Sequence, residues 1–210
     1  MRKIMILFFV VFSFGFDYFK VYNVKDFKDF KMYKVKNSYI NRILKMPKDD
    51  ISDAQKQNLL YLYEKEKMIR DTLLILYKKY KYGFMPYIAT LTQQHLFILE
   101  QFFKKYGITI PKDIEFVGKF DNISIQQEYQ KLLTESLKDK KTAAKLSVRF
   151  MNDLVREYQK VVFNGVSRNI KSMLLKLNAF NKKVLYRFKK GLRNYRNRIT
   201  CRITKKDKIC

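Results

Sequence analysis

The sequence predicts an all-α protein, an antiparallel four-helix bundle with a short extra helix in the crossover and a basic C-terminal extension. After residue 50, apolar residues recur at alternating spacings of three and four, which is the period of an amphipathic helix. Gly and Pro residues separate the periodic segments. The composition, 47% hydrophobic and 16% aromatic in 210 residues, is ample for one packed domain with extensions.

The first helix is expected to begin at "SDAQ", Ser52 to Gln55, which has the S-x-x-Q form of a capping box. The segment "YKYGFMP" should end this helix, with Gly83 as its C-terminal stop and Pro86 near the start of the second helix. The stripe expected to face the core is Leu59, Leu62, Glu66, Ile69, Leu73, Leu76 and Tyr80.

The second helix should end at Gly107, and a loop containing Gly118 leads to a shorter helix near 125–137. Two long helices follow, one over about 142–161 and one after the turn "FNG" at 163–165. The inward stripes are Ile88, Thr92, His95, Leu99, Phe102 and Tyr106 on the second helix, Ala143, Ser147, Phe150, Met151 and Leu154 on the third, and Val166, Ile170, Met173, Leu177, Phe180 and Val184 on the fourth.

We expect four parts in the chain: a signal peptide over 1–15, a basic and aromatic arm or linker over 16–50, the bundle over 51–188, and a basic tail over 189–210. Arg2 and Lys3 precede an apolar run, Ile4 to Phe12, which suits a signal-peptide core and is too short to span a membrane as a helix. Export to the periplasm or the extracellular space is therefore expected, with an uncleaved membrane anchor or burial inside a large assembly as alternatives.

The chain is strongly basic, with 45 Lys and Arg against 19 acids and a net charge of +26. Such a surface attracts a polyanionic partner, nucleic acid or an anionic membrane surface, although a lysine-rich composition spread over solvated faces is the alternative. The basic residues expected to bind such a partner are Lys189, Lys190, Arg193, Arg196, Arg198, Arg202, Lys205 and Lys206.

The cysteines Cys201 and Cys210 both fall in this basic tail. Their spacing matches no zinc motif, and the sequence leaves open whether they pair. Nothing in the sequence identifies a protein partner or an oligomeric state.

Two polar residues, Glu66 and His95, occupy inward positions of the first and second helices. A buried carboxylate has to be paired, protonated or bound to metal, because burial of an unpartnered charge is costly. His95 is the only histidine in the chain, and the residue three positions before it is Thr92, not the carboxylate of a Glu-x-x-His metal motif. We therefore favour a buried Glu66–His95 pair, with a single divalent metal or a catalytic pair as alternatives.

Several segments resemble the bacterial ferritin-like family known as domain of unknown function 2202. "EKEKMIRDTLLILYKKY", "IATLTQQH" and "FFKKYGI" are similar to that family's E-E-E-K-L-A-R-D, I-A-x-S-E-Q-x-H and Y-G-I/L segments. "GKFDNISIQQEYQKLLTESL", "FMNDL" and "VSRNIKSML" follow in the family's order, so the resemblance spans about 59–180. It implies a ferritin-like bundle, and for intact relatives it implies metal-dependent oxygen chemistry.

The resemblance also implies six metal-ligand positions, of which Glu66 and His95 are retained. The other four are replaced, by Thr92, Ser147, Phe150 and Ile170. A dinuclear centre needs several oxygen or nitrogen donors held in place, and this set does not supply them. We therefore expect a degenerate metal site with no cofactor, or at most a single iron or manganese ion.

The sequence favours a non-enzymatic role but leaves open whether the protein is an enzyme. The preferred hypothesis is an exported scaffold or binding module. One alternative is a residual mononuclear metal-binding protein or oxidoreductase that uses Glu66 and His95. The other is a nucleic-acid or ribonucleoprotein component that binds through the basic tail, where Tyr and Phe are interleaved with Lys and Arg.

Overall fold

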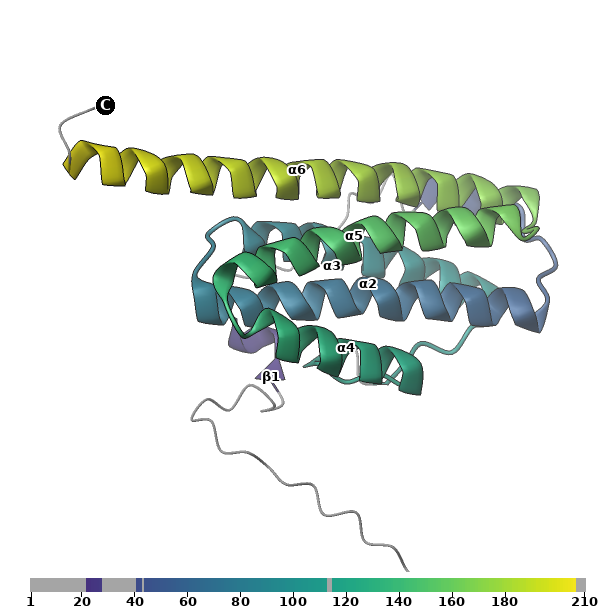
Figure 1. Cartoon of the computed structure of the whole chain (residues 1–210). Helices are drawn as coiled ribbons and strands as arrows, with labels where there is room; N and C mark the ends of the chain where they lie inside the picture. The colour runs from purple at the N-terminus through teal and green to yellow at the C-terminus, as the bar shows by residue number, and fades with distance from the viewer. Residues whose placement is uncertain (1–21, 28–40, 43, 113–114, 207–210) are drawn as a thin grey trace, which may run out of the picture.

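The computed structural model describes residues 22–27, 41–42, 44–112 and 115–206, with side chains described as far as Tyr195. Its long elements are helical, and the protein is all-α as predicted (Figure 1). The helices are α2 (Asp53–Tyr80), α3 (Met85–Tyr106), α4 (Ile123–Ser136), α5 (Lys140–Phe163) and α6 (Arg168–Lys206), and two short strands are β1 (Tyr22–Asn23) and β2 (Phe116–Val117).

Helix α2 begins where the sequence predicts, because Ser52 and Gln55 form the expected capping box. The Gln55 backbone N–H donates to Ser52 Oγ over 3.2 Å, and the Ser52 backbone N–H donates to Gln55 Oε1 over 2.9 Å. The predicted stop at Gly83 is wrong. The residue after α2 is Lys81, whose N–H still donates to the Tyr77 carbonyl. Its left-handed backbone (φ 54°) turns the chain out of the helix, so the helix ends before Gly83 is reached.

The other helix ends follow local capping chemistry. Pro86 lies in the first turn of α3, and Gly107 caps its C-terminus in the left-handed conformation, as predicted. Asn122 Oδ1 accepts hydrogen bonds from the backbone of Ser124 and Ile125, and α4 therefore starts at Ile123. Asp139 caps α5 in the same way through the Thr142 backbone N–H.

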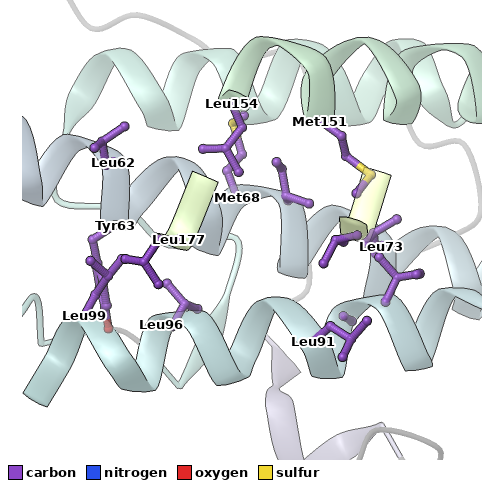
Figure 2. Close-up of a cluster of buried hydrophobic side chains, with 14 of the residues drawn as sticks. Leu62, Tyr63, Met68, Leu73, Leu91, Leu96, Leu99, Met151, Leu154 and Leu177 are labelled. Carbon is purple, nitrogen blue, oxygen red and sulfur yellow. The ribbon is translucent and has the colours of Figure 1, made fainter. Parts of the chain in front are cut away.

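The core is formed around α2, which contacts α3, α4 and α5, while α6 packs on α5 and α3. Every residue from Leu62 to Leu76 is buried, although periodicity alone predicts a single inward stripe. Neighbouring helices on several sides account for this difference. Figure 2 shows part of this core, where side chains of several helices meet, among them Leu62, Tyr63, Met68, Leu73, Leu91, Leu96, Leu99, Met151, Leu154 and Leu177.

Part of the predicted N-terminal arm docks on the crossover between α3 and α4. Strand β1 pairs antiparallel with β2, with Tyr22 opposite Val117 and Asn23 opposite Phe116. Val24 and Phe27, in and after a 3₁₀ turn, are buried against the core. The signal-peptide prediction for 1–15 falls outside the described residues.

Helix α6 continues past the predicted bundle boundary at residue 188. Leu192 and Tyr195 still pack on the core, and the helix then runs to Lys206, well beyond the N-terminal end of α5 (Figure 1). The basic segment therefore continues the fourth helix, as predicted, and the last part of this helix extends away from the other helices. Among the helices that the structure describes, none combines the length and the apolar character needed to cross a membrane.

Gly118, in the turn after β2, should tolerate no side chain. Its φ is +84°, and a Cβ there would lie 2.8 Å from the Tyr129 ring. Gly118→Ala should therefore lower the free energy of unfolding by about 1–3 kcal/mol in urea denaturation. The matched control is Gly83→Ala, where a Cβ meets nothing within 4 Å. An equal loss in both variants would contradict the close contact at Gly118.

Candidate functional site

Helix α2 carries charged side chains in the middle of the protein. Because the helix is covered on several sides, these side chains point toward different neighbours, and each needs a partner inside the protein. The buried charged residues of α2 are Glu64, Lys65, Glu66, Lys67, Arg70 and Asp71.

One group of these charges fixes the crossover loop. Asp71 Oδ2 accepts from Lys67 Nζ over 2.7 Å and from the Gly118 backbone N–H over 2.9 Å, while Asp71 Oδ1 accepts from Arg70 Nε over 2.8 Å. Lys67 Nζ also donates to the carbonyls of Phe116 and Lys119, at 2.8 Å each. Burial lowers the pKa of Lys67, and the Asp71 carboxylate opposes that effect. Asp71 is thus a structural partner of Arg70 and Lys67.

The second group forms at Glu66, which is fully buried. A single oxygen, Glu66 Oε1, meets the Tyr158 hydroxyl at 2.6 Å, Asn181 Nδ2 at 2.8 Å and His95 Nδ1 at 3.0 Å. These residues come from α2, α5, α6 and α3 respectively, so the side chains of four helices meet at one atom. We call Glu66, His95, Tyr158 and Asn181 the polar cluster.

The chemistry of the partners decides which atoms of the polar cluster donate hydrogen bonds and which accept them. An amide NH₂ group can only donate, so Glu66 Oε1 accepts from Asn181, and the Tyr158 hydroxyl donates to the same oxygen. The His95 contact is a third hydrogen bond to this oxygen in the tautomer that carries its proton on Nδ1. Burial and the Glu66 carboxylate raise the pKa of Tyr158 well above its ordinary value, so the hydroxyl keeps its proton. Glu66 Oε2, on the other side of the carboxylate, has no hydrogen-bond partner among the described residues.

The other side of the His95 ring meets α6. The ring packs against Phe180, with centroids 4.2 Å apart and an angle of 33° between the planes. His95 also borders a cavity of about 420 Å³ between α3 and α6. The residues lining this cavity are Gln94, His95 and Ile98 of α3 and Lys176, Leu177, Ala179, Phe180 and Lys183 of α6.

The four positions at which the resemblance implies replaced ligands bring no further acid to the polar cluster. Thr92 Oγ1 donates to the Ile88 carbonyl over 3.1 Å and Ser147 Oγ to the Ala143 carbonyl over 2.8 Å, so both hydroxyls bond their own helices. Ile170 is buried in the apolar core, and Phe150 is half-buried at its edge.

The polar cluster does not fit a dinuclear metal centre. It offers one carboxylate, of which one oxygen already accepts hydrogen bonds, and one imidazole whose Nδ1 is bonded to that oxygen. Within the part of the chain that the structure describes, no group of three or more His, Cys, Asp or Glu side chains is placed to hold a metal ion.

The predicted basic residues are only partly described. Lys189, Lys190 and Arg193 are exposed on α6. The side chains of Arg196, Arg198, Arg202, Lys205 and Lys206 lie outside the described part of the structure, as does the predicted alternative of a Cys201–Cys210 pair.

Sequence reasoning brought Glu66 and His95 together but missed Tyr158 and Asn181. The spacing of residues in the sequence places both Tyr158 and Asn181 on inward faces of their helices. Tyr158 continues the stripe of Ser147, Met151 and Leu154 at helical spacing, and Asn181 lies four residues after Leu177. A polar residue that continues an inward stripe is the pattern that identifies such partners.

Tyr158→Phe tests the polar cluster without creating a large cavity. Removal of a hydroxyl that donates to a buried carboxylate should lower the free energy of unfolding by about 1.5–3 kcal/mol, measured by urea denaturation. Tyr129→Phe is the matched control, since Tyr129 is buried with no side-chain hydrogen bond described for its hydroxyl, and should cost less than about 0.5 kcal/mol. Equal stability of Tyr158→Phe and the wild-type protein would contradict the described hydrogen bond.

Comparison with known proteins places the chain among uncharacterised relatives. The uncharacterized protein MJ0754 of Methanocaldococcus jannaschii is 27% identical over 158 residues, covering 75% of this chain and 85% of that protein. The crystal structure of the hypothetical protein MJ0754 is similar with a TM-score of 0.67 at 27% identity, over 71% of this chain and 86% of that one. The family model described as "Uncharacterized protein domain (DUF2202)" matches residues 55–206, and the chain belongs to this family.

Proposed function

We propose that the protein is a ferritin-like four-helix bundle that serves as a binding or scaffold module, with the polar cluster in place of a dinuclear metal centre. In this proposal α2, α3, α5 and α6 are the bundle helices and α4 is the extra helix of the crossover. Contacts between α2 and α3 support an antiparallel arrangement, because Tyr63 bonds Glu100 and the later residue Arg70 bonds the earlier residue Gln93. The apolar run Ile4 to Phe12 supports export of this module.

One observation carries the non-enzymatic role: Glu66 Oε1 accepts hydrogen bonds from three other helices. A carboxylate that bridges two metal ions would need its oxygens for those ions and would need further acids to balance their charge. Here Asn181 and Tyr158 occupy that coordination space with neutral donors. The cluster therefore joins four helices by hydrogen bonds at the place where a dinuclear centre would need metal ligands.

Metal content tests this proposal directly. Protein purified without chelator from medium containing iron and manganese should hold far less than one equivalent of either metal by mass spectrometry, because the cluster offers a single carboxylate. Stoichiometric metal that is lost in Glu66→Ala would contradict the proposal and favour the residual metalloprotein. Asp153→Asn, which removes a surface carboxylate of α5, is the control that should leave the metal content unchanged.

A second candidate function is binding of a polyanion by the extended end of α6. The observations that favour it are that Lys189, Lys190 and Arg193 are exposed on the last part of α6 that packs on the core, that the helix continues from there to Lys206, and that no acid lies between 182 and 206. A helix of this kind lets its basic side chains contact phosphates without a clash between the nucleic acid and the rest of the protein.

This candidate is tested with a DNA duplex of arbitrary sequence. Replacement of Lys189, Lys190 and Arg193 by Gln should weaken binding and reduce the salt dependence, by about 0.9 in the log–log slope for each phosphate that the variant no longer neutralises. Arg168, Lys171 and Lys182, exposed on the earlier part of α6, form the control set with the same change of net charge. Equal weakening in both sets would show a diffuse charge effect and contradict a binding site at the end of α6.

A further inference from the structure

We propose that the cavity between α3 and α6 binds a small amphipathic monocarboxylate, a molecule with an apolar body and one carboxylate group. The inference deepens the proposed binding role and rests on it in one respect, namely that His95 Nδ1 is held by Glu66. The cavity has about 420 Å³, within the range of roughly 300–1,000 Å³ that is usual for small-molecule sites.

The inner wall of the cavity is apolar. Ile98 of α3 and Leu177 of α6 are buried, and Phe180 is half-buried with its ring against His95. His95 is only 1% exposed, and its Nδ1 is bonded to Glu66, so it offers the cavity little more than a ring edge. An alkyl or aryl body is the chemistry that gains most from this wall, because it removes apolar surface from water on both sides.

The outer part of the cavity carries positive charge. Lys176 and Lys183 are exposed and lie seven residues apart on α6, which places them two turns apart on the same side of the helix. No ion pair of either lysine is found among the described residues, and the lining contains no acid. A carboxylate at the opening would be attracted by both ammonium groups, whereas a cationic ligand would be repelled.

A single carboxylate fits this arrangement better than a phosphate-rich ligand. The polar groups at the opening are two lysines and Gln94, and no arginine or cluster of backbone N–H groups is present in the described lining to hold several phosphate oxygens. The ligand would therefore place its carboxylate between Lys176 and Lys183 and its apolar end toward Phe180 and His95.

The binding test uses the full-length protein with octanoate as the probe, measured by calorimetry. Because the chain has one histidine, its imidazole NMR signals can be assigned to His95, which borders this cavity. Saturable binding of octanoate that shifts the His95 signals supports the proposal. No binding, or binding that leaves those signals unchanged, overturns it. Binding of 1-octanol as tight as that of octanoate overturns the assignment of a carboxylate.

Variants at the opening locate the two parts of the ligand. Lys176→Gln with Lys183→Gln should weaken octanoate binding about three- to tenfold, since each exposed ion pair contributes a factor of about 1.5 to 5. The matched control is Lys182→Gln, which removes an exposed α6 lysine that does not line the cavity. Ala179→Phe should block the opening and weaken binding by more than about tenfold with little effect on folding, because Ala179 is exposed. An equal effect of Lys182→Gln and the double variant overturns the site.

Failure of this inference and failure of the proposed function give different results. Stoichiometric metal bound through Glu66 would overturn the proposed function, whatever octanoate does. Metal-free protein that does not bind octanoate would overturn the cavity assignment and leave the role of the polar cluster in place.

Discussion

A helix that is surrounded by other helices and still carries charges has to find a partner for each charge inside the protein. Helix α2 is such a helix, because its residues from Leu62 to Leu76 are all buried. The cost of leaving one of these charges unpaired is several kcal/mol, so the positions of the neighbouring elements are limited to those that supply a partner. Lys67 and Asp71 fix the crossover loop, and Glu66 fixes α3, α5 and α6.

The two groups of charges differ in whether both oxygens of the carboxylate have a hydrogen-bond donor. Around Asp71, each oxygen has a donor, and the lysine uses its three protons on the carboxylate and two carbonyls. Around Glu66, the three donors meet one oxygen and the other has no partner in the described structure. The first group is therefore a closed structural network. The second retains a buried carboxylate oxygen, Glu66 Oε2, without a described hydrogen-bond partner, and it lies beside the cavity that His95 borders.

Helical spacing was enough to predict the helices and the pairing of Glu66 with His95, because spacings of three and four fix which face a side chain occupies. Spacing could not show that α2 is covered on several sides, since the periodicity of one helix does not indicate how many other helices pack against it. It also could not identify Lys81 as the residue that caps α2, because a lysine in the left-handed conformation has no sequence signal comparable to glycine. The partners of Lys67 are backbone carbonyls of a loop, whose conformation follows no period.

Asn181 and Tyr158 could have been predicted, because both continue inward stripes at helical spacing.

The proton on His95 tests the central claim most directly. If Glu66 Oε1 accepts from His95 in a core without metal, the ¹H–¹⁵N NMR spectrum of the single histidine should show a protonated Nδ1 whose proton is hydrogen-bonded and slow to exchange. An Nδ1 without a proton, or a histidine signal broadened by a paramagnetic ion, would show that the ring faces a different partner. Either result would contradict a polar cluster held together by hydrogen bonds to Glu66.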